Sequence, residues 1–501
     1  MQQHPPATTP EEEARAVLSE LADIHSRVLS EGRAMMEGWQ PAIKRTEFLP
    51  SAENLAHYLA FRRFNIRPLQ ERLSQLGLSS LGRSEAHVLA SLQAVLATLS
   101  AIAASWPVDR PNPRRFSEGA ALLEKRQSDI LGRDPDGPRT RIMVTLPAEA
   151  AEDRSIAFRV IAAGADVARI NCAHDSAEAW SAMIAHVREA AATLNRDVRI
   201  LMDLGGPKIR IGEVNEAAAA GRLFRGDRFV LCDRLQTKRG VAEATLCPPV
   251  LLDVMAPGHT VWINDGKIGA RVAGVEGRRA TLEVFSARDK GERLKPEKGV
   301  NLPGVELPVA ALTGEDIANL DFVASHADIV GYSFVQRPSD VTQLLAELEA
   351  RRGGRALPAL MLKIETPLAV KNLPRLIVQA AAETPVAVMI ARGDLAVEIG
   401  LERLPEIQEE ILWLCEAAHV PVVWATQVLD SMVKDGAATR AEATDAAMGQ
   451  RAECVMLNKG PFLAEAVTFL DGVLRRMDRH QIKKTPQLSA LNSWREPQTL
   501  G

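Results

Sequence analysis

The sequence predicts an α/β fold, a (β/α)8 TIM barrel with a small β-barrel lid domain inserted after strand 3 and a helical domain at its N-terminus. Three observations predict it. From Arg141 onward, short apolar runs alternate with amphipathic, helix-like stretches. A strand-like, turn-rich segment interrupts this alternation after the third run, and the residues from about 10 to 104 show only helical periodicity.

Eight apolar runs are the expected barrel strands, because parallel strands covered on both faces appear as continuous apolar runs. They are 142–146, 166–171, 200–203, 329–334, 360–364, 386–391, 420–425 and 454–457. Helix-like segments follow most of them, as at 176–192, 339–351, 404–418 and 462–477. An open doubly wound sheet is the competing fold, but its glycine-rich phosphate turn is not found here.

The expected domain limits follow from these patterns. A helical extension covers 1–135, and a stretch rich in Pro, Asp and Gly ends it. The barrel takes 136–212 and 301–480, the lid domain takes 213–300, and a polar tail covers 481–501. Since active sites of such barrels lie where strands pass into loops, a domain inserted there is expected to close over the site.

The amino-acid composition excludes some classes of binding partner. The 501 residues carry a net charge of −4 and only 4% aromatic residues, which argues against nucleic acid as a partner. The first residues have neither a basic start nor an apolar core, and no apolar run suits a membrane span. The five cysteines are scattered, as expected of reduced thiols. We therefore expect a cytoplasmic protein with a small-molecule partner.

Polar residues gather at the carboxyl ends of the apolar runs, which is the catalytic end of this barrel type. Arg169 and Asn171 end the second run, Asp203 the third, Ser333 the fourth, Lys363 and Glu365 the fifth, and Thr426 the seventh, while Asp394 follows the sixth. A network that served stability alone would have no reason to prefer this end. The pattern therefore predicts a catalytic rim.

Lys363 and Glu365 alternate on one strand and so share a face. Asp394 of the next strand is expected to lie within reach of Glu365, and two carboxylates with open positions suit Mg²⁺. A structural Lys–Glu ion pair explains this motif equally well when it is taken alone.

The stretch Ala391-Arg392-Gly393-Asp394 can present backbone N–H groups to an anion, although a simple N-cap aspartate is the plainer explanation. Thr426 alone would fit an ordinary strand-to-helix turn. Arg169 lies within an apolar strand and needs an anionic partner nearby.

These residues, taken in order, resemble the pyruvate kinase family from about Arg141 to Arg476. The matching stretches are 167–174, Asp203 with 206–212, 265–266, 298–304, 362–365, 389–395, 425–427 and 439–442.

The resemblance implies that phosphoenolpyruvate gives its phosphoryl group to ADP, yielding pyruvate and ATP in the last step of glycolysis. It implies that Lys363 stabilises the migrating phosphoryl group, that Arg169 binds the phosphate and that Thr426 lies beside the methylene carbon. The substrate carboxylate would meet the backbone of Ala391, Arg392, Gly393 and Asp394. Glu365 and Asp394 would hold Mg²⁺, with Mn²⁺ as an alternative.

The nucleotide would be contacted by Asn171, His174, Arg210 and Lys298, the last delivered by the lid domain. Asn171, Asp203 and Lys208 fall in the family's monovalent-cation region. Potassium-dependent members have a serine at Ala173, a threonine at Leu204 and a glutamate at Lys208. We therefore expect the Lys208 ammonium to replace K⁺, so that K⁺ is not required.

Two other stretches differ from the family's usual sequence. After the first strand, the usual Thr-Ile-Gly-Pro is shortened to Thr145-Leu-Pro147. After the eighth strand, the usual Ser-Gly-Glu-Thr is replaced by Asn458-Lys-Gly-Pro461. Only a short polar tail follows Met477, where the family has a C-terminal domain that holds the site for sugar-phosphate activators. Regulation by sugar phosphates is therefore not expected. A homo-oligomer, dimer or tetramer, is expected from the family.

Two other functions stay open on the sequence. One is a Mg²⁺-dependent lyase or aldolase acting on 2-oxo acids, which would need neither Lys363 nor Lys298. The other is a non-catalytic homologue that binds phosphoenolpyruvate, which the altered strand-eight motif favours and the retained rim residues oppose.

Overall fold

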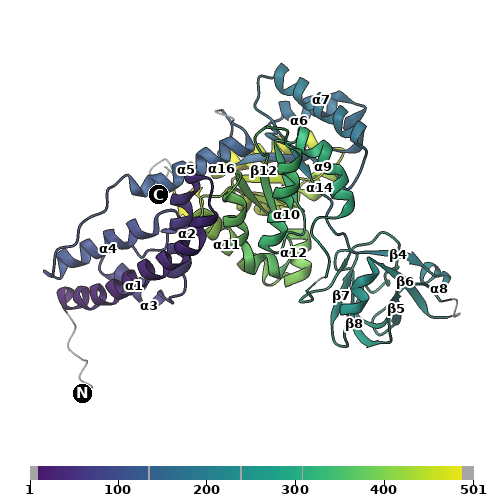
Figure 1. Ribbon diagram of the computed structural model, residues 1–501, viewed down its shortest axis with the longest axis horizontal. Coiled ribbons are helices and arrows are strands. Elements are labelled where there is room, and N and C mark those ends of the chain that lie inside the picture. The colour runs from purple at the N-terminus through teal and green to yellow at the C-terminus, as the bar shows by residue number, and fades with distance from the viewer. Residues whose placement is uncertain (1–8, 134–135, 237–239, 307, 488–501) are drawn as a thin grey trace, which may run out of the picture.

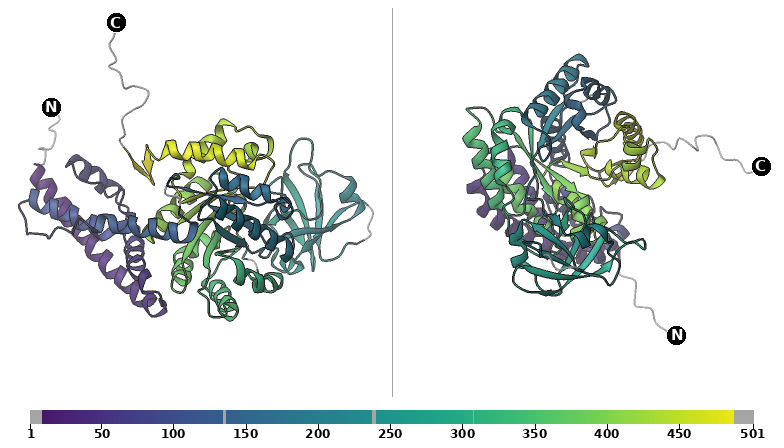
Figure 2. Two further views of the ribbon diagram at one scale, coloured as in Figure 1. Left: turned by 90° about the horizontal axis from the view of Figure 1, so that it is seen from above. Right: turned by 90° about the vertical axis from the view of Figure 1, so that its right-hand side faces the viewer.

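The computed structural model describes residues 9–133, 136–236, 240–306 and 308–487. A helical bundle, a barrel and an inserted β domain follow one another along the long axis of the molecule (Figure 1). Two further views confirm that the bundle and the inserted domain lie on opposite sides of the barrel (Figure 2). Most of the predicted tail, 488–501, lies outside the described residues, as do the first eight residues and the predicted end of the helical extension, 134–135.

The N-terminal bundle is helical, as predicted. Its helices are α1 (Pro10–Trp39), α2 (Leu49–Phe61), α3 (Arg67–Gln75), α4 (Val88–Ile102) and α5 (Arg115–Leu131). The first helix starts at a capping box, in which the Thr9 side chain accepts from the backbone N–H of Glu12 and the Glu12 side chain accepts from that of Thr9.

One described stretch, Glu85–Ile102, is long and apolar enough to cross a bilayer by length and composition alone. Inside the protein, 56% of that stretch is buried. Val88, Leu92 and Leu99 are fully buried in the large hydrophobic core. This burial is that of a core helix within a packed bundle.

The predicted eight-stranded parallel barrel is confirmed, and it is closed. Its strands are β1 (Arg141–Thr145), β2 (Val167–Asn171), β3 (Arg199–Asp203), β11 (Ile329–Tyr332), β12 (Ala359–Ile364), β13 (Val386–Ala391), β14 (Val422–Ala425) and β15 (Cys454–Leu457). Each pairs with the next in this order, and β15 returns to β1. The fourth strand ends two residues earlier than its apolar run, because Phe334 has a positive φ of 54° that turns the chain.

Helices cover the outside of the barrel. They are α6 (Arg154–Ala162), α7 (Ala177–Thr193), α9 (Gly314–His326), α10 (Pro338–Arg351), α11 (Pro367–Ala381), α12 (Arg392–Ile399), α13 (Leu404–Ala417), α14 (Asp430–Asp435), α15 (Arg440–Gly449) and α16 (Leu463–Met477). A two-stranded hairpin, β16 (Gln481–Ile482) and β17 (Thr485–Pro486), follows the last helix.

Between β3 and α9 the chain forms the lid domain, a seven-stranded sheet in the order β10-β7-β8-β9-β5-β6-β4. Its elements are β4 (Arg210–Val214), α8 (Glu216–Ala220), β5 (Arg228–Cys232), β6 (Ala242–Cys247), β7 (Thr260–Ile263), β8 (Ile268–Val275), β9 (Arg279–Ser286) and β10 (Val300–Asn301). Phe229, Val261 and Leu282 belong to a hydrophobic core that this domain does not share with the barrel. The lid domain is therefore inserted after the third barrel strand, as predicted.

The helical bundle closes the amino end of the barrel. Ile130 and Leu131, at the end of α5, belong to the cluster of side chains that fills the barrel interior. Arg126 donates to the carbonyls of Ala418 and His419, just before β14. The carboxyl end is left free for the site.

Candidate active site

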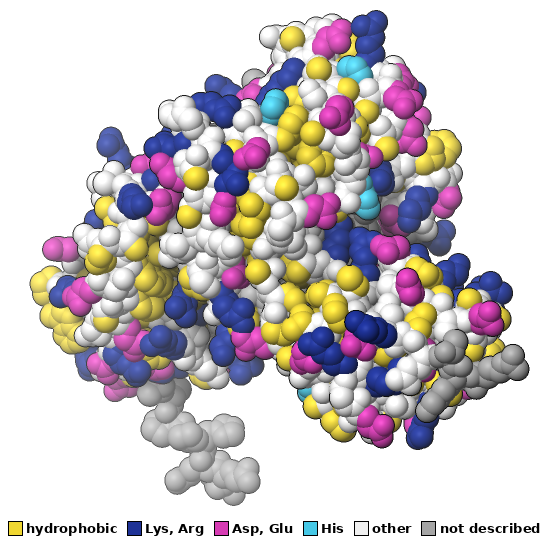
Figure 3. All heavy atoms as spheres, turned by 45° about the vertical axis from the view of Figure 1, so that its right-hand side comes forward, with side chains coloured by type: hydrophobic (Ala, Val, Ile, Leu, Met, Phe, Trp, Pro, Cys, Tyr) yellow, Lys and Arg dark blue, Asp and Glu magenta, His cyan; other side chains and the backbone are white. Residues whose placement is uncertain are grey.

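A cavity of about 380 Å³ lies at the carboxyl end of the barrel, between the strand ends and the lid domain. The space-filling view shows Lys and Arg side chains gathered in the hollow between these two parts (Figure 3). Predicted site residues that line the cavity are Arg169, Asn171, Lys208, Arg210, Lys298, Lys363, Glu365, Ala391, Asp394 and Thr426. Residues from seven barrel strands or the loops that follow them, and from the lid domain, thus meet at one place, as the strand-end pattern predicts.

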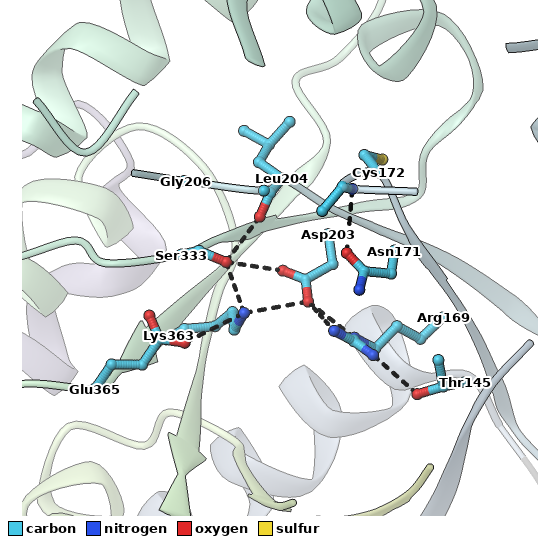
Figure 4. Close-up of polar contacts among 12 residues, drawn as sticks. Thr145, Arg169, Asn171, Cys172, Asp203, Leu204, Gly206, Ser333, Lys363 and Glu365 are labelled. Atoms are coloured by element: carbon cyan, nitrogen blue, oxygen red, sulfur yellow. Dashed lines mark hydrogen bonds and ion pairs between the residues drawn. The ribbon is translucent and has the colours of Figure 1, made fainter. Parts of the chain in front are cut away.

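Asp203 lies under the cavity and joins two of its cations (Figure 4). One carboxylate oxygen of Asp203 accepts from Arg169 Nε at 2.8 Å and Nη2 at 2.5 Å, and from Lys363 Nζ at 3.2 Å. Burial alone would raise the pKa of Asp203, but the charges of Lys363 and Arg169 hold it below its usual value. Asp203 therefore stays ionised and fixes both cations in place.

Two hydroxyl groups complete this arrangement. Arg169 Nη1 donates to Thr145 Oγ1 at 2.9 Å, and Lys363 Nζ donates to Ser333 Oγ at 2.6 Å. The Ser333 hydroxyl in turn donates to the Leu204 carbonyl at 2.7 Å. Burial would lower the pKa of Lys363, but Asp203 and Glu365 raise it above its ordinary value, so the ammonium keeps its charge.

Glu365, which is buried, and Asp394, which is half-buried, are the carboxylates that face the cavity. Glu365 Oε1 lies 3.3 Å from Lys363 Nζ, and Oε2 accepts from the Phe334 N–H at 2.6 Å. Burial raises the pKa of Glu365 to about 7, with the Lys363 charge opposing and the Asp394 charge adding to the rise. Burial also raises the pKa of Asp394, against the charge of Lys363 and with that of Asp265. The positive charge near these two carboxylates is therefore too small to offset the effect of burial on their pKa values.

This donor set fits Mg²⁺. The described residues hold no cluster of three or more His, Cys, Asp and Glu side chains arranged to bind a metal. Mg²⁺ needs no such cluster, since one or two carboxylates hold it while water and substrate oxygens fill its other positions. Glu365 and Asp394 both face the cavity, so an ion between them would remain open to a substrate.

The loop after β13 meets the loop after β14. The Gly393 N–H donates to Thr426 Oγ1 at 2.7 Å, and Thr426 and Gln427 both have positive φ, 66° and 56°. Such conformations are strained for residues other than glycine and cluster at functional turns. In this conformation the Thr426 side chain lines the cavity beside Gly393.

The Arg392 side chain takes no part in lining the cavity. It forms a bidentate ion pair with Asp445, donates to the carbonyls of Ala425 and Thr426, and lies over the Trp424 ring. The backbone of this residue begins α12, but its guanidinium supports the Thr426 turn from behind.

The predicted nucleotide residues divide between two neighbouring cavities. Asn171, Arg210 and Lys298 line the cavity described above, whereas His174 lines an adjoining one of about 810 Å³. Lys208 and Arg210 line both cavities. Burial lowers the pKa of Lys208 to about 8, helped by the nearby charges of Arg210 and Lys363. His174 also has a lowered pKa, through burial and then the positive charges of Lys208 and Lys459.

Some lining residues were missed on the sequence. Asn301 and Glu398 both face the cavity and are hydrogen-bonded to each other. Glu398 is four residues after Asp394, and this spacing on a helix would have placed the two on one face. Asn301 gives no such signal, because strand β10 is only two residues long.

A family model described as the pyruvate kinase barrel domain matches residues 137–467. A pyruvate kinase of Methylorubrum extorquens is 37% identical over 349 residues, which are 68% of this chain and 69% of that protein. One of Corynebacterium efficiens is 36% identical over 324 residues, 64% of this chain and 65% of its own. Pyruvate kinase 2 of Synechocystis is 32% identical over 351 residues, 69% of this chain and 57% of its own.

The matched region includes all eight barrel strands and the lid domain, and every rim residue named above lies within it. The helical bundle up to α5 precedes it. On the barrel, the inserted domain, the rim and these similarities, the chain belongs to the pyruvate kinase family of phosphotransferases.

Proposed function

We propose that the chain transfers the phosphoryl group of phosphoenolpyruvate to ADP, giving pyruvate and ATP, through the rim residues assigned here. The observation that carries the assignment is the pair of cations, Arg169 and Lys363, that Asp203 holds beside the carboxylates Glu365 and Asp394. In phosphoryl transfer the protein mainly positions the partners and neutralises charge, and this set of groups does both.

Arg169 binds the phosphate of the substrate, because its guanidinium is fixed at one edge of the cavity and its planar donors match phosphate oxygens. Lys363 lies across Asp203 from Arg169 and stabilises the charge of the group in transit. The P–O bond to the enol oxygen breaks as a bond to a terminal oxygen of ADP forms. The enolate that is left then takes a proton at its methylene carbon.

Thr426 supports that proton transfer. Its oxygen already accepts from the Gly393 N–H, so its own hydroxyl proton is free to donate toward the cavity. The backbone from Ala391 to Asp394 opens α12 beside it and offers N–H groups to the substrate carboxylate. Glu365 and Asp394 would hold Mg²⁺, or Mn²⁺, which when bound neutralises charge on the phosphoryl oxygens.

Lys208 supplies the monovalent positive charge in this proposal, and K⁺ is then not required. Leu204 and Ala173 offer no side-chain oxygen to a cation. The ammonium of Lys208 is close enough to Asp203 for that carboxylate to raise its pKa, against the stronger effects of burial and Arg210. With a pKa of about 8, Lys208 is charged at neutral pH.

Asn171, His174, Arg210 and Lys298 bind the nucleotide in the same proposal. The lid domain, 213–300 with the adjoining residues of β4 and β10, closes over it. The other units in this proposal are the helical part, 1–135, the barrel, 136–212 with 301–480, and the segment 481–501. The protein acts in the cytoplasm as a homo-oligomer, as its family suggests.

The test is an assay for pyruvate formed from phosphoenolpyruvate and ADP with Mg²⁺, run with and without K⁺. Lys363→Met removes the ammonium while keeping the length of the side chain. Lys371→Met, at an exposed position on α11, is the matched control. We expect activity without K⁺ that is lost in Lys363→Met and kept in Lys371→Met.

Three other outcomes of this assay would contradict parts of the proposal. A strict K⁺ requirement at saturating substrate and Mg²⁺ would contradict the role of Lys208. Binding of phosphoenolpyruvate without turnover would favour a non-catalytic homologue. Cleavage or condensation of a 2-oxo acid that survives Lys363→Met would favour the lyase or aldolase.

A further inference from the structure

One polar contact joins the lid domain to α12, the helix that carries Asp394, and has no part in the mechanism above. Asn301 Nδ2, on β10, donates to Glu398 Oε1, on α12, at 3.2 Å. Both side chains are half-buried and line the catalytic cavity. Strand β10 packs against α12, the helix on the side of the barrel that faces the lid domain (Figure 1).

Glu398 belongs to the same face of α12 as Asp394, one helical turn away. Burial raises the pKa of Glu398 to about 7, with the Asn301 hydrogen bond opposing that rise and the charge of Asp394 adding to it. An ionised carboxylate in this position is unfavourable without a donor, and Asn301 is its donor.

Asn301 belongs to the strand that leads from the lid domain back to the barrel, three residues after Lys298. That strand is fastened to the lid domain, because Asn301 pairs with Trp262 of β7 and the Lys298 carbonyl accepts from the Ile211 N–H at 2.8 Å. The place of Asn301 therefore sets the place of Lys298. The contact with Glu398 connects the strand of the proposed nucleotide lysine with the helix of a proposed metal ligand.

We propose that Asn301 and Glu398 are positioning residues, whose hydrogen bond holds Lys298 at a fixed place relative to Asp394 and so tunes the affinity for the nucleotide. This inference rests on the proposed function for the role of Lys298. The ligands proposed for phosphoenolpyruvate, namely Arg169, Lys363, Gly393 and Thr426, all lie on the barrel. Loss of the contact therefore weakens ADP binding and spares phosphoenolpyruvate binding.

Isothermal titration with ADP and, separately, with phosphoenolpyruvate in the presence of Mg²⁺ tests this split on the full chain. Asn301→Ala and Glu398→Ala remove the contact, whereas Glu398→Gln keeps an acceptor oxygen for Asn301. Asp253→Asn weakens an exposed ion pair to Arg278 within the lid domain and is the matched control. We expect the Kd for ADP to rise about tenfold in both alanine variants and in their double variant alike.

In the same experiment the Kd for phosphoenolpyruvate should change less than twofold, and Glu398→Gln and Asp253→Asn should resemble the wild type. The inference is overturned if both ligands weaken equally, if Glu398→Gln behaves as Glu398→Ala, or if the two alanine effects simply add.

Hydrogen exchange separates this inference from the proposed function. The amides of 297–301 should exchange faster in Asn301→Ala and Glu398→Ala than in the wild type and in Glu398→Gln, whatever the ligand. Unchanged exchange overturns the contact itself. Faster exchange in a protein that binds neither ligand would retain the contact and overturn the proposed function.

Discussion

The two ends of the barrel use polar residues in opposite ways. At the amino end, the bundle donates hydrogen bonds to carbonyls that precede the strands, and His419 is hydrogen-bonded on both ring nitrogens. At the carboxyl end, the carboxylates Glu365 and Asp394 have raised pKa values and face an open cavity. One end of this fold is thus completed by the chain itself, whereas the other is left for ligands to complete.

The side chains inside the barrel follow the same division. Leu131 from α5 joins Met143, Val167 and Met361 in the apolar filling of the barrel. Asp203, fully buried nearer the carboxyl end, is surrounded by charged partners instead. We therefore expect substitutions at the amino end to change stability and those at the carboxyl end to change turnover.

The largest expected effect is at the carboxyl end. Asp394→Asn should lower kcat with Mg²⁺ by on the order of 10³-fold, because the charge of a proposed Mg²⁺ ligand is lost. Since burial disfavours the ionised carboxylate, the melting temperature without Mg²⁺ should stay the same or rise. Steady-state kinetics and thermal unfolding check both. A fall in both quantities would break the comparison.

At the amino end, Leu131→Ala should lower the free energy of unfolding by about 3 kcal/mol, because Leu131 is fully buried and its loss leaves a cavity. Denaturant unfolding measures this change. The kcat of the folded protein should remain that of the wild type. Loss of kcat at unchanged stability would show that the two ends are coupled.

His419 gives the amino end a dependence on pH. Burial lowers its pKa to about 4, against the hydrogen bond to the Ala86 carbonyl, so the native state keeps it neutral while the unfolded chain protonates near its ordinary 6.5. Its contribution is present above pH 6.5 and is lost as the pH falls toward 4.

Between about pH 7.5 and about pH 5 this group should remove about 2 kcal/mol of stability. The difference in unfolding free energy between the wild type and His419→Gln, followed over that range, isolates it from the other titrating groups. A difference that does not vary with pH would contradict the assignment.

The smallest expected effect concerns Lys208. Its pKa of about 8 predicts that K⁺-free activity falls about tenfold between about pH 7 and about pH 9, as the ammonium loses its proton. Lys208→Arg, which keeps the charge throughout, should show a shallower decline. A profile that the arginine variant does not change would assign the decline to another group.

Much of this arrangement could be predicted because it is local. The eight strands follow from continuous apolar runs, and the rim residues follow from their places at strand ends. Ser333, Lys363 and Thr426 lie at the rim for that reason.

The rest depends on contacts between distant segments. No pattern in the sequence shows that Asp203 would hold both Arg169 and Lys363, which come from different strands. The outward turn of Arg392 follows from Asp445, 53 residues later. The closure of the amino end by α5 likewise depends on how the bundle docks, which helical periodicity does not specify.

The lid domain is inserted between two strands that are neighbours in the barrel. Strands β3 and β11 are neighbours in the barrel, and Ile329 pairs with Leu201 although the whole lid domain lies between them in the chain. The polypeptide thus leaves the barrel and returns to it at adjoining points, and the excursion has a hydrophobic core of its own. No strand of the excursion pairs with a strand of the barrel, so the barrel can close independently of the inserted domain.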